Sequence, residues 1–162
     1  MKIQELDRIK WLGFQEPDYV PFGDPTDAST GDFIADPIQE GLKESNTSLP
    51  LDARYLALAA GQAYPELRVA SRLRIAPERI TLVDRDFSWR ARARFGREFP
   101  QVQTVETGIF EFLENPPSAD FSLVTALGIE YVLDEPEVMN TLISRLPRIM
   151  RPGGIVAVFP YR

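Results

Sequence analysis

Four short segments of this sequence carry side chains and turns that can do chemistry, and each lies at or just after a strand-like run. They are LALAAGQAYPE at 56–66, VDRD at 83–86, ETGIFEF at 106–112 and ADFSLVTALGIEYVLDE at 119–135. The sequence has no histidine and no cysteine. Thiol nucleophiles, disulfides, zinc–thiolate sites and imidazole bases or metal ligands are therefore excluded. Chemistry must come from carboxylates, from backbone groups and from the positioning of a bound molecule.

Regular elements from residue 53 onwards must position these segments. Strand-like runs occupy 53–60, 79–83, 101–105, 121–127 and 155–159, and helical patterns occupy 65–75, 88–99 and 110–114. Asp134 is expected to cap a further helix, which Pro147 should kink or end early, and RPGG at 151–154 is expected to form a tight turn. Alternating strands and helices predict an α/β domain with a parallel sheet covered on both faces. Ligands bind to such sheets beyond the carboxyl ends of the strands, where the strand order reverses.

The first 50 residues have a different character. Residues 2–12 show near-helical apolar spacing that predicts a helix, and Gly13 would stop it. Residues 13–37 are dense in Pro, Gly, Asp and Thr and predict a long loop, although aromatic residues are interleaved in it. A short helix is expected to follow, as far as about residue 43. We therefore expect an N-terminal extension at 1–50, acting as a lid or wrap, and one Rossmann-like domain at 51–162.

Composition places the chain among ordinary globular proteins. Of its 162 residues 44% are hydrophobic and 26% are charged, which argues against wholesale disorder. No apolar run reaches the roughly 18 residues that a membrane span needs, and the first residues are charged, unlike a secretory signal. The absence of cysteine fits the cytoplasm. We therefore expect a cytoplasmic protein without membrane contact.

The net charge of −6 hides a basic middle segment. Residues 68–97 hold nine arginines and three acids, whereas both flanking segments are acidic. An acidic protein has little general affinity for nucleic acids, which depends on neutralising phosphates. We favour a solvated helix face whose arginines pair with the acidic N-terminal segment. An anionic partner such as RNA is the less favoured alternative.

The order of these segments resembles that of the class I S-adenosylmethionine-dependent methyltransferases, over about residues 53–160. That family has a glycine-rich turn after its first strand, an acid ending its second, a fourth-strand segment of the form phenylalanine–aspartate–apolar–valine, and an Arg/Lys-Pro-Gly-Gly turn before its fifth. Val83–Asp84 and the RPGG turn with its preceding helix match best. The resemblance implies a Rossmann-like, doubly wound parallel sheet of about five strands, with S-adenosylmethionine as the cofactor.

The resemblance also implies where the cofactor would lie. Small residues in the first turn let the backbone approach the methionine and ribose, the acid after the second strand accepts hydrogen bonds from ribose hydroxyls, and an apolar residue after the third strand covers the adenine. The implied cofactor-binding residues are Ala57, Ala59, Gly61, Gln62, Ala63, Asp84, Arg85, Ile109, Phe110 and Ala126. Methyl transfer is an in-line displacement that positioning can accelerate, and it needs no metal, histidine or cysteine.

The chain also departs from the family pattern. Of the three glycines usual in the first turn only Gly61 is present, and Ala57, Ile109 and Ser122 stand where the family usually has acids. The family's last helix and terminal hairpin are absent, which leaves the fifth strand near an open edge. The N-terminal segment would cover that edge, or a second subunit would do so in a homodimer.

Three functions are consistent with these features. The leading prediction is a small, divergent methyltransferase with an unknown acceptor and unassigned catalytic residues. The second is a non-catalytic, methyltransferase-like module that binds or regulates a partner. The third and weakest is a nucleotide- or RNA-associated protein that uses the arginine face.

Overall fold

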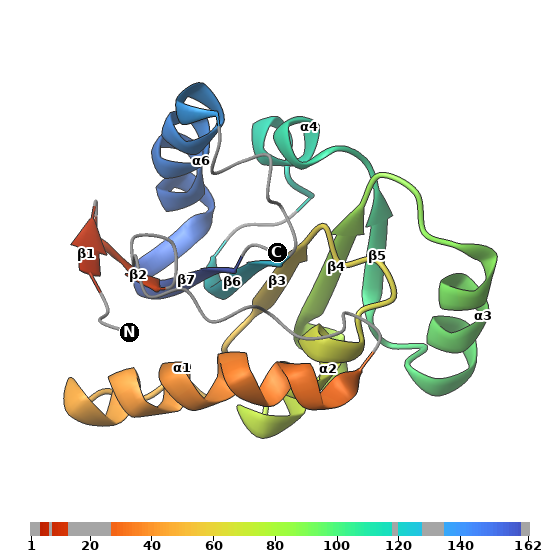
Figure 1. Cartoon of the computed structure of the whole chain (residues 1–162), viewed down its shortest axis with the longest axis horizontal. Coiled ribbons are helices and arrows are strands. Elements are labelled where there is room, and N and C mark those ends of the chain that lie inside the picture. Colours follow the sequence, from red (N-terminus) through yellow and green to blue (C-terminus); the bar gives the residue numbers. More distant parts are fainter. Residues whose placement is uncertain (1–3, 7, 13–26, 118–119, 128–134, 160–162) are drawn as a thin grey trace.

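A single twisted sheet organises the chain in the computed structural model, which describes residues 4–6, 8–12, 27–117, 120–127 and 135–159 (Figure 1). The strands lie in the order β1-β2-β7-β6-β3-β4-β5, and only β1 is antiparallel to its neighbour. Their bounds are Gln4–Leu6 for β1, Ile9–Leu12 for β2, Tyr55–Leu58 for β3, Ile80–Asp84 for β4, Gln103–Glu106 for β5, Phe121–Leu127 for β6 and Met150–Phe159 for β7. The described sheet thus has seven strands, six of them parallel, where the sequence predicts about five.

Helices cover both faces of this sheet, as the sequence predicts. The helices are Asp32–Glu44 (α1), Tyr64–Arg72 (α2), Trp89–Glu98 (α3), Ile109–Glu114 (α4) and Pro136–Ile149 (α6), with short 3-10 turns at Ala28–Gly31 and Pro77–Arg79. One core cluster joins the sheet to α1, α2 and α3. A second cluster joins the other face to α4 and α6. Strand β6 is buried along its whole length between them, as expected for an apolar strand in a parallel sheet.

Strand β3 is the point at which the strand order reverses. It pairs with β4 on one side and with β6 on the other, so that Ala57 lies between Leu82 and Thr125. The chain then continues outward to β5 on one side and to β7 on the other. The carboxyl ends of β3, β4 and β5 therefore meet at one edge of the sheet, beside the switch point where doubly wound proteins bind ligands.

The predicted helix at 2–12 is wrong. Its described residues form the antiparallel strands β1 and β2, and Arg8 turns between them with a φ of 71°. Lys10, Trp11 and Leu12 of β2 pair in parallel with Ile155, Val156 and Ala157 of β7. The apolar spacing looks helical, but the backbone groups of β7 provide pairing partners that no local pattern reveals. The N-terminal segment therefore covers the edge that the sequence leaves open.

The predicted loop at 13–37 is also wrong where the structure describes it, from residue 27 on. Asp27 caps the 3-10 turn at Ala28–Gly31, and α1 follows with Pro37 inside it. Asp32 of α1 forms ion pairs with Arg68 and Arg72 of α2, and Asp36 forms one with Arg72. These contacts and the burial of Ile34 and Ile38 favour a helix in spite of its proline. Residues 13–26 lie outside the described part.

Two predictions near the end of the chain need correction. Pro147 does not end α6, which continues to Ile149, because a proline in the last turn removes only one late hydrogen bond. The RPGG segment is not a separate turn, because β7 already begins at Met150. The register of β6 against β7 shifts between Phe121 and Leu123, and Gly153 takes a φ of 79° there. Asp134, the predicted cap of α6, lies outside the described residues.

Among the described residues, no helix is long and apolar enough to cross a membrane.

Candidate functional site

The turn after β3 has an alternating backbone conformation. Ala59, Gly61 and Ala63 have φ values of 55°, 54° and 56°, all in the left-handed region. Glycine adopts this region freely, whereas an alanine in this conformation lowers the stability of the folded chain by about 1–2 kcal/mol. These are the positions at which the resemblance expects glycines. The turn therefore keeps a glycine-type backbone although two of its three residues carry a Cβ.

The carboxylate of Asp84 joins this turn to the end of β4. Its Oδ2 accepts a hydrogen bond from the Gly61 N–H at 2.8 Å, and its Oδ1 accepts one from the Asp86 N–H at 3.2 Å. The Ala60 N–H donates to the Val83 carbonyl at 3.0 Å, which ties the same two segments together. A carboxylate has about four lone-pair sites, so Asp84 retains acceptor capacity for a ligand.

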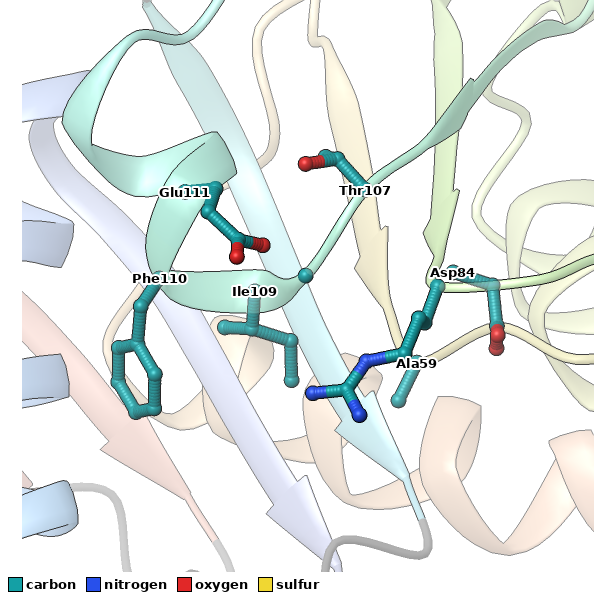
Figure 2. Close-up of a pocket in the computed structure, with 8 residues that line it drawn as sticks. Ala59, Asp84, Thr107, Ile109, Phe110 and Glu111 are labelled. Atoms are coloured by element: carbon teal, nitrogen blue, oxygen red, sulfur yellow. The ribbon is translucent and has the colours of Figure 1, made fainter.

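A cavity of about 420 Å³ opens beside Asp84 at the carboxyl ends of β3, β4 and β5. Figure 2 shows Asp84 and Ala59 on one side of it and the first turn of α4, with Ile109, Phe110 and Glu111, on the other. The lining residues are Ala59, Asp84, Arg85, Thr107, Gly108, Ile109, Phe110 and Glu111. The cavity thus combines a partly buried carboxylate, a guanidinium, a hydroxyl and an apolar surface.

Five of the ten predicted site residues line this cavity: Ala59, Asp84, Arg85, Ile109 and Phe110. The other five lie near it without lining it. Ala57 and Ala126 are buried in β3 and β6, Gly61 and Gln62 are exposed in the turn, and Ala63 is buried at the start of α2. Five predicted residues thus share one cavity at this edge of the sheet, and their roles in binding a cofactor remain predictions.

Three lining residues escaped the sequence reasoning, although they belong to a segment that it singled out. They are Thr107, Gly108 and Glu111, between β5 and α4. A Cβ at Gly108 would collide with the Glu111 carboxylate, which folds back over the start of α4. The sequence signal for this arrangement is a glycine followed three residues later by a glutamate. A carboxylate in the first helical turn interacts favourably with the free N–H groups there.

A buried carboxyl group lies behind the turn. Glu66, in the first turn of α2, is only 2% exposed, and burial raises its pKa to about 8, with a smaller contribution from the Asp84 charge. Tyr55 of β3 is completely buried and shares a hydrogen bond of 2.6 Å with the Thr125 hydroxyl. Burial and the nearby Glu66 raise the pKa of Tyr55 well above its usual value. Sequence reasoning missed Glu66, because an acid in the first turn of a helix is usually exposed.

Ion pairs occupy much of the arginine-rich segment. Arg68 and Arg72 pair with Asp32 and Asp36 of α1, and the Arg68 and Arg72 guanidinium groups lower the pKa of Asp32. Arg92 pairs with Asp86 and Glu106, which are next in sequence to the cavity-lining residues Arg85 and Thr107. The predicted pairing between this segment and the acidic N-terminal residues is therefore confirmed for α1 and α2.

Comparison with solved structures finds the same fold in proteins of low sequence identity. DesVI of Streptomyces venezuelae matches 83% of this chain with 50% of its own, with a TM-score of 0.57 and 17% identity. A proposed caffeoyl-CoA O-methyltransferase from Staphylococcus aureus matches 76% of this chain with 55% of its own, with a TM-score of 0.52 and 15% identity. WbdD matches 87% of this chain with 31% of its own, with a TM-score of 0.53 and 20% identity.

The chain spans about half the length of the first two structures and about a third of the third. No protein-family model and no curated protein matches the sequence. The structural matches confirm the Rossmann-like, methyltransferase-type fold that the sequence predicts.

Proposed function

We propose that this chain is an S-adenosylmethionine-dependent methyltransferase domain that acts on an acceptor still to be identified. The observation that carries the proposal is the position of Asp84. Its carboxylate ends β4, is held by the turn after β3, and lines a cavity beside the switch point of the sheet. A carboxylate in this position is suited to accept hydrogen bonds from the two hydroxyls of a ribose.

The residues present fit this cofactor. Asp84 would bind the ribose, and the side chains of Ile109 and Phe110, both only partly buried, would cover the adenine. The small residues at 59–63 would allow the backbone close to the methionine part. When bound, the cofactor supplies a methyl group on a sulfonium, ready for in-line displacement. The chain contributes binding, orientation and exclusion of water, which can supply much of the acceleration without an acid or base.

One observation favours a second candidate, a non-catalytic module of the same fold. Ala57 stands where a carboxylate would help to hold the amino end of the cofactor, and its side chain is fully buried in β3. Two of the turn residues are strained alanines. A module of this kind would keep the fold and the cavity but would bind S-adenosylmethionine poorly or not at all.

Titration of the chain with S-adenosylmethionine and with S-adenosylhomocysteine separates the two candidates. The methyltransferase proposal predicts that both ligands bind and raise the melting temperature as their concentration rises. Replacing Asp84 with asparagine should weaken the binding of both ligands. If neither ligand binds at millimolar concentration, the proposal is overturned in favour of the non-catalytic module.

A further inference from the structure

A second cavity, of about 230 Å³, lies at the edge of the sheet opposite the cavity beside Asp84. Its walls come from early residues of β2, β6 and β7 and from the segment after α1, whereas the first cavity lies at the carboxyl ends of β3, β4 and β5. The polar side chains that line it belong to Lys10, Thr47, Ser48, Ser122 and Arg151. Its volume far exceeds the roughly 15 Å³ that one water molecule requires. A small molecule can therefore enter it.

A bulge in β6 brings Ser122 to this cavity. The N–H groups of Ser122 and Leu123 both donate to the Arg54 carbonyl, at 2.8 Å and 3.2 Å, which is the two-against-one pattern of a bulge. Phe121 packs in the cluster on the α6 face of the sheet and Leu123 in the cluster on the α1 face. Residues two apart in a regular strand share a face, so Ser122 is the inserted residue.

Strand β7 is irregular at the same place. Its residues 151–154, the RPGG segment, stand opposite Ser122 alone between two regular pairs of β6 and β7. Gly153 has a φ of 79°, and a Cβ at Gly154 would lie only 3.0 Å from the Arg151 carbonyl oxygen. The two glycines therefore permit a backbone path that leaves the regular ladder and makes room for the cavity.

Lys10 contributes a cation to the cavity. It shares a strand face with Leu12, which packs in the cluster on the α1 face. Its Nζ donates one long hydrogen bond, of 3.4 Å, to Thr47 Oγ1, and that hydroxyl also shares a hydrogen bond of 2.7 Å with Ser45 Oγ. An ammonium group has three N–H donors. Two donors of Lys10 therefore remain for a ligand.

Arg151 contributes a second cation. Its Nη1 and Nη2 donate to the two carboxylate oxygens of Asp52 at 2.8 Å and 2.9 Å. This pairing uses two of the five N–H donors of the guanidinium and fixes its plane. Asp52 offsets the charge of Arg151, but Lys10 forms no ion pair with any described residue. The cavity thus keeps an excess of positive charge and of hydrogen-bond donors.

The hydroxyl of Ser122 has no role in the folded chain that its contacts explain. Ser122 is 2% exposed, and its Oγ has no hydrogen-bond partner among the described residues. A buried hydroxyl without a partner costs free energy, and an alanine would avoid that cost. Ser122 belongs to the inner wall of the cavity, whereas Lys10 and Arg151 are partly exposed. A ligand that enters between the two cations would supply the missing acceptor.

The lining selects an anion with several acceptor oxygens. None of the described lining residues carries a carboxylate, and the donors come from β2, β6 and β7, so they approach from different directions. A tetrahedral oxyanion can accept from each of them, whereas a planar carboxylate offers two oxygens. Leu42 and Leu49, both partly buried, form an apolar part of the wall that suits a small organic group.

We propose that this cavity binds a phosphate group, either free or on a small phosphorylated molecule, with Lys10, Ser122 and Arg151 as its ligands. The site shares no residue with the cavity beside Asp84. The proposal therefore goes beyond the proposed function and does not depend on it.

Isothermal calorimetry at constant ionic strength tests the site with inorganic phosphate, glycerol 3-phosphate and acetate. Wild type should bind phosphate or glycerol 3-phosphate saturably at millimolar concentration and acetate much more weakly. Lys10→Met should lower the affinity about tenfold or more, and Ser122→Ala about threefold to tenfold, as expected for hydrogen bonds to a charged group. Ser122→Ala should leave the stability of the chain without ligand undiminished. Lys43→Met is the matched control, because Lys43 is exposed in the last turn of α1 and the change in charge is the same.

The outcomes separate the sources of the phosphate from failure of the site. Tighter binding of glycerol 3-phosphate assigns the site to a phosphorylated molecule, and equal binding assigns it to free phosphate. Absence of saturable binding, equally tight binding of acetate, or affinities that Lys10→Met and Ser122→Ala leave unchanged would each overturn the proposal. If the variants do not fold, NMR of wild type decides. Phosphate should shift the amide signals of Ser48 and Gly154 and not those of Thr107 and Gly108, which line the first cavity; the reverse would overturn the proposal.

Discussion

The buried Glu66 should make the stability of this protein strongly dependent on pH, and Glu66→Gln should remove most of that dependence. Burial raises the pKa of this carboxyl from 4.5 to about 8. Each unit of difference between the folded and unfolded states corresponds to about 1.4 kcal/mol, so this one group contributes roughly 5 kcal/mol of pH-dependent stability. That is a large part of the 5–15 kcal/mol typical of a domain.

The direction of the effect follows from proton counts. Between pH 4.5 and about 8 the folded chain keeps the Glu66 proton while the unfolded chain has released it. The contribution of Glu66 is therefore fully present below pH 4.5, falls as the pH rises, and is lost above about pH 8. Glutamine cannot ionise, so the variant should be more stable than wild type at alkaline pH and similar to it in acid.

Urea denaturation in steps from about pH 5 to pH 9 measures this directly through the free energy of unfolding. The control variant is Glu78→Gln, because Glu78 is exposed. Wild type and Glu78→Gln should lose stability over this range, and Glu66→Gln should lose several kcal/mol less. Parallel curves for wild type and Glu66→Gln would refute the reasoning, because they would show that Glu66 has the same pKa in both states.

Two further predictions concern the same part of the molecule. Ala59→Gly should raise the free energy of unfolding by about 0.5–1 kcal/mol, because relief of the left-handed alanine outweighs the extra freedom of glycine in the unfolded chain, and Ala59 is only partly buried. A loss of stability in urea denaturation would contradict the turn conformation. Tyr55→Phe should lower the free energy of unfolding by about 1–3 kcal/mol, because it leaves the buried Thr125 hydroxyl unpaired. Adding Thr125→Val to this variant should restore most of the loss. Additive losses in this double-mutant cycle would show that the two hydroxyls do not interact.

The sequence predicts the part of the fold in which local pattern and tertiary structure agree. The elements from β3 to β6 follow from apolar runs alternating with helical ones, and the edge that carries Asp84 follows from parallel topology. Strand β2 cannot be predicted from the local sequence pattern, because its pairing depends on β7, more than 140 residues away along the chain. The later part of helix α1 follows from the predicted short helix that ends near residue 43, but its start at Asp32 does not, because Asp32 is held by Arg68 and Arg72 of α2.

The candidate site is predictable to a similar extent. Asp84 is recognisable because an acid directly follows a buried strand, and the turn at 59–63 is recognisable by its small residues. The hydrogen bond between Gly61 and Asp84 is a property of the folded backbone, which the sequence does not reveal. Glu66 looks like an ordinary acid in the first turn of a helix. Only the packing of α2 against β3 and α3 shows that it is buried.

The central claim is that the cavity beside Asp84 binds S-adenosylmethionine, and calorimetric titration tests it most directly. Wild type should bind, and a ligand concentration of 100 times Kd should stabilise the chain by about 2.7 kcal/mol. Asp84→Asn should lose most of this binding. Asp120→Asn is the matched control, because Asp120 is exposed at the opposite end of the sheet and its left-handed backbone suits asparagine. Equal binding by wild type and Asp84→Asn, or binding by neither, would contradict the claim.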